Sequence, residues 1–173
     1  MMQSSPLNFR RAVIWLGRLL IGGIFIYAGY AKLVYPNHHF SPWFMLKFSV
    51  SANLSTFAFQ VESYKILGAA ASAFVAHTLP FVEIVLGLLL LLGWHLRIWA
   101  TIVSAILVGF LGAVTRAYLL HMDINCGCFG TPEPLTIMTV LRDSALLLLA
   151  LVMTVFAYQE ARTAHPWTAA TNS

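Results

Sequence analysis

Four long apolar stretches dominate the chain, and shorter polar or aromatic segments separate them. The stretches cover approximately residues 13–34, 66–92, 98–119 and 135–158. A helix needs about 20 apolar residues to cross the hydrocarbon core of a bilayer, so each stretch is long enough for one crossing. The pattern predicts an all-α, polytopic membrane protein built as a bundle of four transmembrane helices.

The limits of this membrane domain follow from the same pattern. Residues 12–158 are expected to form it, with a cytoplasmic tail over 1–11 and a disordered polar tail over 159–173. The first apolar stretch lies where a signal peptide would, but it exceeds the roughly 7–15 apolar residues of such a segment, and no Ala-x-Ala site follows it. We therefore expect an uncleaved first helix.

The segment 36–63 is too polar to span a membrane and too aromatic for a plain loop. It is expected to form one or two short helices that lie in the membrane interface, between the first two spans. Its role stays open between an aromatic belt that anchors the fold and a cover over a lipid-soluble substrate. The side chains concerned are His38, His39, Phe40, Trp43, Phe44, Phe48, Phe57 and Phe59.

Composition supports lipid as the solvent of this chain. Hydrophobic residues make up 60% and charged residues only 9%, against roughly 25% charged in soluble proteins. The net charge of +4 is not gathered into a basic run. We therefore expect a lipid bilayer around the protein and no nucleic-acid partner.

The distribution of arginines predicts an orientation. Four spans place both termini on one side, together with Arg10, Arg11, Arg97 and Arg162. The positive-inside rule makes that side cytoplasmic. In a bacterial inner membrane the segment between the last two spans then faces the periplasm, a compartment that favours disulfide chemistry.

The first stretch carries a distinct face. Steps of three and four residues place five side chains on one side of a helix, namely Arg18, Gly22, Phe25, Gly29 and Lys32. The two glycines are expected to let another helix approach closely. Lys32, near the end of the stretch, is expected to extend its ammonium group to the interface.

A carboxylate lies deep in the second stretch. Glu83 follows His77 and Pro80, a proline expected to kink the helix. An unpaired charge at that depth is costly, so Glu83 must be neutral or have a cationic partner, for which Arg142 and Arg18 are the candidates. The role stays open between a structural ion pair and a proton-handling group beside a redox site.

The two cysteines of the chain lie one residue apart, at Cys126 and Cys128, in a polar hairpin over 121–134. A disulfide across one residue closes a small, strained ring, which makes it more oxidising, and Gly127 and Gly130 supply backbone freedom. Thr131-Pro132-Glu133 predicts the start of the last helix, whose dipole would stabilise a thiolate. Arg116 is expected to add positive potential.

Two other interpretations of the cysteines remain. His121, Cys126 and Cys128, with Met122, would suit a soft ion such as Cu(I). Alternatively, the cysteines form an inert staple or two unrelated thiols, although a one-residue loop removes little entropy from the unfolded chain.

Several motifs occur in a fixed order along the chain. They are RLLIGGIFIYAGYAKL at 18–33, YKIL at 64–67, LPFVE at 79–83, CGCFG at 126–130 and LRD at 141–143. In this order the chain resembles the DoxX-like membrane proteins over about residues 11–158, in particular their methylamine utilisation (MauE) branch. It departs from that pattern at Gly68, where a proline is expected.

The resemblance implies a four-helix membrane protein linked to thiol redox chemistry, with thioredoxin-like partners. MauE proteins are associated with maturation of the methylamine dehydrogenase small subunit, a periplasmic protein rich in disulfides. By this resemblance a periplasmic thioredoxin-like protein or a disulfide-bonded client would be the partner.

The resulting hypothesis is a membrane thiol–disulfide oxidoreductase in which Cys126 and Cys128 react, with Cys128 favoured as the nucleophile. Electrons would pass to or from a quinone lodged among the helix aromatics. The alternative is a non-catalytic membrane assembly factor or a copper-handling subunit. Supporting roles are expected for Glu83, Arg142, Arg18, His77 and Arg116, and structural roles for Gly127, Gly130, Pro80, Gly22 and Gly29.

Overall fold

The structure is a computed structural model that describes residues 6–33, 50–127 and 134–163. Five helices make up this part of the protein. Four of them, α1, α3, α4 and α5, are long and apolar enough to cross a membrane, which confirms the predicted fold class. The helices are α1 (Pro6–Leu33), α2 (Val50–Ser63), α3 (Ala69–Leu92), α4 (Leu96–Leu119) and α5 (Ile137–Thr163).

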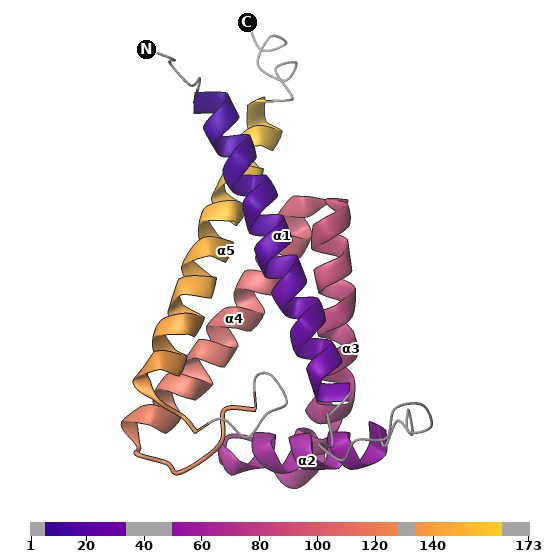
Figure 1. The fold of residues 1–173 in the computed structure, drawn as a ribbon, viewed down its shortest axis with the longest axis vertical. Coiled ribbons are helices and arrows are strands. Elements are labelled where there is room, and N and C mark those ends of the chain that lie inside the picture. Colours follow the sequence, from indigo (N-terminus) through magenta and orange to yellow (C-terminus); the bar gives the residue numbers. More distant parts are fainter. Residues whose placement is uncertain (1–5, 34–49, 128–133, 164–173) are drawn as a thin grey trace, which may run out of the picture.

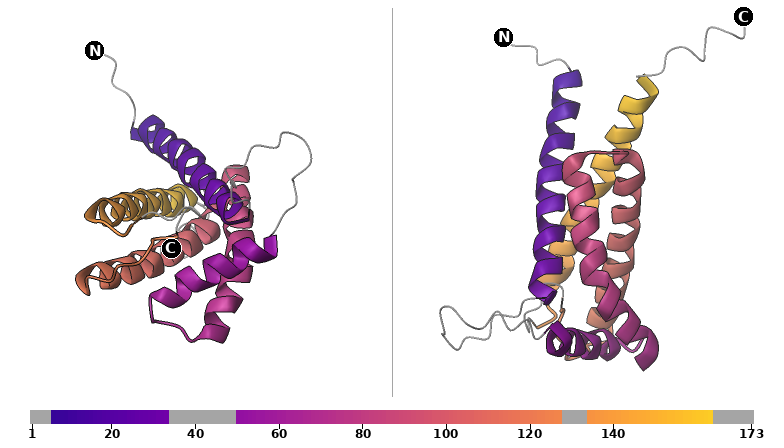
Figure 2. Two further views of the ribbon diagram at one scale, coloured as in Figure 1. Left: turned by 60° about the horizontal axis from the view of Figure 1, so that its bottom comes forward. Right: turned by 90° about the vertical axis from the view of Figure 1, so that its right-hand side faces the viewer.

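The short helix α2 lies across one end of the bundle, while the start of α1 and the end of α5 lie at the other end (Figures 1 and 2). The amide of Asn53 on α2 donates to the carbonyl of Leu33, the last residue of α1. Leu54 and Phe57 on α2 are buried. Since a helix end leaves its last carbonyls without partners, Asn53 both satisfies α1 and fixes α2 on the bundle.

Large apolar side chains on the outer faces of the long helices are exposed. Leu19, Phe74 and Leu148 are 57%, 70% and 65% exposed. Side chains of this size in water would be an association hazard, whereas lipid solvates them. The interior contains a smaller apolar core around Ile21, Leu90, Val103 and Met153, among other buried residues. The four helices therefore indicate a multi-pass membrane protein.

Two helix ends differ from the expected boundaries. Residues 159–163, expected in a disordered tail, continue α5 to Thr163, and α1 already begins at Pro6. The α3–α4 turn agrees with expectation: Gly93 has a φ of 72° and its N–H meets the carbonyls of Leu89 and Leu90. Gly68 occupies the N-cap position of α3.

The predicted face of α1 packs against α3. Arg18 donates to the backbone carbonyls of Leu90 and Leu91, where the last turn of α3 leaves acceptors free. A Cβ at Gly22 would lie 3.0 Å from the carbonyl oxygen of Gly87, which itself lacks a side chain. The two backbones therefore touch, as small residues allow in membrane bundles.

The helices α1 and α3 approach each other closely at a second position, Gly29. A Cβ there would lie 2.5 Å from the carbonyl oxygen of Pro80 and 2.7 Å from Cγ1 of Ile84. Neither the backbone nor the β-branched side chain can retreat without moving the helix. Gly29 thus fixes how closely the end of α1 lies against the middle of α3.

Replacing Gly29 by alanine is expected to lower the free energy of unfolding by about 1–3 kcal/mol, because the methyl group overpacks this contact. Gly23→Ala is the matched control, since it lies on the same helix and a Cβ there meets nothing within 4 Å. Thermal unfolding in detergent, followed by circular dichroism, measures both. Equal melting temperatures would contradict the packing.

Candidate functional site: a cavity between α3 and α4

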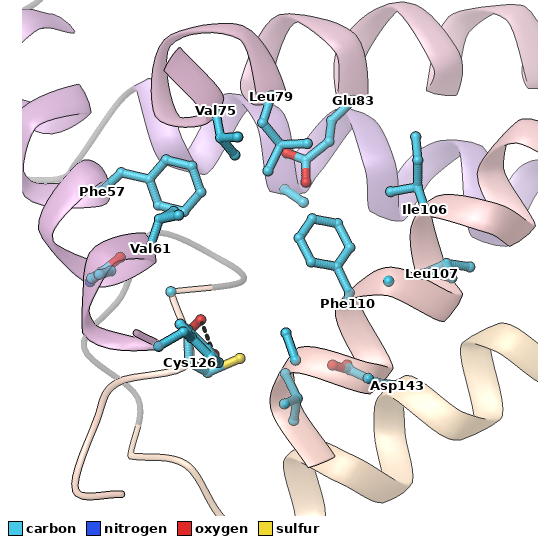
Figure 3. A pocket seen from close by; sticks show the side chains of 18 of the residues that line it. Phe57, Val61, Val75, Leu79, Glu83, Ile106, Leu107, Phe110, Cys126 and Asp143 are labelled. Carbon is cyan, nitrogen blue, oxygen red and sulfur yellow. Dashed lines mark hydrogen bonds between the residues drawn. The ribbon is translucent and has the colours of Figure 1, made fainter. Parts of the chain in front are cut away.

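A cavity of about 630 Å³ lies at the α2 end of the bundle. Residues of all five helices and of the segment after α4 line it (Figure 3). The lining is mostly apolar, with a few ionisable or polar groups. These groups are Lys32, Gln60, Tyr64, Glu83, Arg116, Cys126 and Asp143.

The cavity exists because α3 and α4 separate below the turn that joins them (Figure 1). α1 packs along α3, and α4 packs along α5, where the Ser104 and Thr154 hydroxyls lie 3.2 Å apart. Val75 and Leu79 of α3 face the cavity, opposite Phe110 of α4 (Figure 3). The space between the two helix pairs is closed at one end by α2.

An ion pair lies in the wall of this cavity. Nζ of Lys32 is 2.8 and 2.7 Å from the two carboxylate oxygens of Glu83, and the two side chains are 2% and 4% exposed. The ring of Phe57 on α2 lies 5.4 Å from the ammonium. The Glu83 side chain extends from α3 into the cavity (Figure 3).

This pair corrects two expectations. Lys32 does not extend to the interface, and neither Arg142 nor Arg18 is the partner of Glu83. The physical reason is Gly29: it brings α1 against α3 one turn before Lys32, which places the ammonium beside the carboxylate. Two buried opposite charges then compensate each other where either one alone would be very costly.

Cys126 also lines the cavity. Its residue is 6% exposed, and its sulfur extends toward the cavity interior (Figure 3). Cys126 is therefore buried, although it belongs to the predicted polar hairpin. Cys126 is not a free thiol in the structure. Cys128 and Gly130 lie outside the described residues, so their placement stays a prediction.

The backbone of Cys126 is held against α2. The hydroxyl of Tyr64 donates to the carbonyl of Cys126 at 3.0 Å, and Arg116 donates to the carbonyl of Tyr64 at 3.0 Å. Burial, with a smaller contribution from the nearby Asp143 carboxylate, raises the pKa of Tyr64 to about 12. The phenol therefore stays protonated, and able to donate, throughout the neutral range.

The residue after Cys126 requires a glycine. Gly127 has a φ of 67°, in the left-handed region. A Cβ there would lie 2.6 Å from Oε1 of Gln60 on α2. Any larger residue would be strained in this backbone conformation and would push the end of the Gln60 side chain aside. Gly127 thus turns the chain at the cavity wall.

The hairpin around the cysteines closes where a helix was expected to begin. Asn125 and Pro134 form an antiparallel bridge, and the N–H of Leu135 donates to the carbonyl of Ile124 at 3.1 Å. Residues 134–136 are therefore not helical, and α5 starts at Ile137. The predicted start signal itself, Thr131-Pro132-Glu133, lies outside the described residues.

Arg142 supplies the positive charge near the sulfur. Its Nη2 lies 3.9 Å from Sγ of Cys126, and its Nε lies 3.2 Å from Oδ1 of Asp143. Arg142 is on the second turn of α5, so the helix presents a full charge to the sulfur instead of its dipole alone. A cation at this distance favours the thiolate form of a cysteine.

Comparison with known proteins identifies the family. The model of the family described as methylamine utilisation protein MauE matches residues 10–156. The chain belongs to the MauE family. No curated protein and no solved structure matches the chain. The match extends from the first span into the last. Cys126 and Gly127 of the CGCFG motif and Asp143 of the LRD motif line the cavity of this MauE protein.

Two of the expected supporting residues and one candidate metal ligand lie elsewhere in this MauE protein. Arg18 lies at the α3–α4 turn, over the ring of Trp15, and does not line the cavity. His77 is exposed, and its Nδ1 donates to the carbonyl of Ala73. His121 is exposed as well. Among the described residues no three His, Cys, Asp or Glu side chains form a metal group, and a site that includes Cys128 stays a prediction.

Sequence reasoning missed several residues of the site. Lys32 was on the correct helix face but was given the wrong role. Gln60, Tyr64 and Asp143 carried no assigned role, although YKIL and LRD were among the motifs of the family. The available signal for Tyr64 and Asp143 was that their motifs occur in a fixed order with the cysteine motif. The contacts of Tyr64 with Cys126 and of Gln60 with Gly127 depend on tertiary packing.

The ion pair generates a test. Lys32→Met or Glu83→Leu alone is expected to cost about 3–5 kcal/mol of unfolding free energy, because each leaves an uncompensated buried charge. The double variant is expected to recover most of that loss. Thermal unfolding of all four proteins in detergent gives the coupling energy.

An exposed ion pair serves as the control. Arg11 and Glu160 lie 3.9 Å apart with side chains 69% and 38% exposed, so Arg11→Met is expected to cost less than about 1 kcal/mol. Additive effects of Lys32→Met and Glu83→Leu would contradict the coupling described here.

Proposed function

We propose that this MauE family membrane protein passes electrons between a thioredoxin-like partner, or a disulfide-bonded client, and an acceptor in the membrane. Cys126 and Cys128 form the reacting pair. The protein lies in a bacterial inner membrane with both termini in the cytoplasm and the cysteine hairpin in the periplasm. Maturation of periplasmic disulfide-containing proteins, such as those of methylamine utilisation, is the process it serves.

One observation carries the proposal. The Cys126 sulfur is buried at the wall of an apolar cavity between membrane spans, 3.9 Å from the Arg142 guanidinium. An inert staple would gain nothing from a cation beside its sulfur. A reactive cysteine needs one, because the thiolate is the nucleophile and the leaving group in disulfide exchange.

The burial of Cys126 divides the work between the two cysteines. A protein partner is too large to reach a sulfur that faces the cavity. We therefore assign the exchange with the partner to Cys128, the cysteine that the sequence favoured: a partner thiolate forms a mixed disulfide with the Cys128 sulfur, and the Cys126–Cys128 bond breaks. Cys126 is released as a thiol that faces the cavity, the second partner thiol releases Cys128, and the pair is left as a dithiol while the partner becomes oxidised.

Trapping tests this division. Cys126→Ser is expected to accumulate a mixed disulfide with a thioredoxin-like partner, because no second thiol resolves it. Cys128→Ser is expected to trap far less, and the double serine variant none. Non-reducing electrophoresis with mass spectrometry of the captured protein measures this. Equal trapping by both single variants would refute the assignment, and no trapping by either would refute the relay.

The role of Arg142 has a separate test. In the Cys128→Ser background, Arg142→Gln is expected to slow alkylation of Cys126 by at least about threefold at neutral pH, because the thiolate loses its cation. Arg97→Gln is the matched control, an exposed arginine at the α3–α4 turn. Alkylation rates come from mass shifts with iodoacetamide. Equal rates in both variants would exclude Arg142 from this role.

The alternative of an assembly factor or copper-handling subunit makes opposite predictions. It requires that the double cysteine-to-serine variant still supports client maturation, or that copper copurifies in stoichiometric amount. No feature of the described residues favours it.

A further inference from the structure

Three properties distinguish this cavity from a void left by imperfect packing: its volume, the reactive groups that face it and its lining. Its volume of about 630 Å³ falls in the range of small-molecule sites. The buried Lys32–Glu83 pair and the Cys126 sulfur both face it. Apart from a few polar groups its lining is apolar, with Phe57 from α2 and Phe110 from α4 as the ring-bearing walls (Figure 3).

Two of the α4 residues that line the cavity are glycines and carry no side chain. Gly109 and Gly112 both line the cavity and are exposed, and a Cβ at either one would meet nothing within 4 Å. Both glycines lie within the α4 span. The cavity is therefore reached from the lipid-facing side of α4, at a place where no side chain blocks a molecule moving in from the bilayer.

We propose that a lipid-soluble quinone enters between α3 and α4 and places its ring in this cavity. The proposal rests on the proposed thiol–disulfide function and names its membrane acceptor. Oxidation of a dithiol releases two electrons and two protons, and a quinone takes up both. Two S–H bonds break, one S–S bond forms, and the two quinone carbonyl oxygens become the hydroxyls of a quinol.

The Lys32–Glu83 pair positions one end of the ring. An ammonium has three N–H donors, and two of those of Lys32 meet the Glu83 oxygens. The third meets no acceptor among the described residues and donates to a quinone carbonyl. Glu83 keeps the ammonium in place and compensates its charge. The ring then lies between the pair and Cys126, against Phe57 and Phe110.

Quinone binding is tested in protein that lacks both thiols, so that the result does not depend on the proposed redox function. Decylubiquinone is added to purified Cys126→Ser/Cys128→Ser protein in nanodiscs, and binding is followed by the rise in melting temperature and by equilibrium dialysis. Saturable binding is expected, and decanol, which has the chain without the ring, is expected not to compete. Absence of saturable binding, or equal competition by decanol, overturns the proposal.

Blocking variants locate the site. In the same background, Gly109→Leu is expected to weaken decylubiquinone binding at least tenfold by filling the cavity from an open position. Gly112→Leu, at the second open position, provides an independent block should Gly109→Leu not fold. Gly23→Leu is the matched control, because Gly23 also has open space around its Cβ but does not line the cavity. Unchanged binding in a folded Gly109→Leu or Gly112→Leu protein overturns the proposal.

Discussion

The ion pair between Lys32 and Glu83 is the constraint around which the site is arranged. Both residues lie in membrane spans, and their side chains are almost fully buried, where neither charge is tolerable alone. The pair requires that α1 and α3 touch at backbone distance, which Gly29 permits against Pro80. This one close contact therefore fixes the position of α1 against α3. It also determines where the ion pair lies in the wall of the cavity.

The cavity follows from unequal helix packing. α1 is bound to α3 by the glycine contacts and the ion pair, and α4 is bound to α5 by hydroxyl and apolar contacts. Between these two pairs, α3 and α4 share a tight turn and then separate (Figure 1). α2 and the hairpin close the wide end, and Tyr64 ties them together. Cys126 in the hairpin thereby lines a cavity between the spans.

The hairpin sets where the last helix can begin. The Asn125–Pro134 bridge lies just before α5, which starts at Ile137. This start brings Arg142 within reach of Cys126. The expected positive influence on the cysteine is thus present, but it comes from a guanidinium on the second turn and not from the helix terminus. The burial of Cys126 was not foreseeable, because α2 covers it from far along the chain.

The sequence by itself determined the four spans, the interfacial helix, the α1 face and the need for a glycine beside Cys126. These depend on hydrophobic length, helical period and backbone conformation, which are properties of short segments. Only the tertiary structure decided that Lys32 is the partner of Glu83, that Arg142 lies beside Cys126, and that Arg18 caps α3 instead of joining the site. Hydrophobic periodicity shows which face of a helix is special, but it carries no information on which helix that face meets. That choice depends on close backbone contacts between residues about 50 positions apart, as at Gly29 and Pro80.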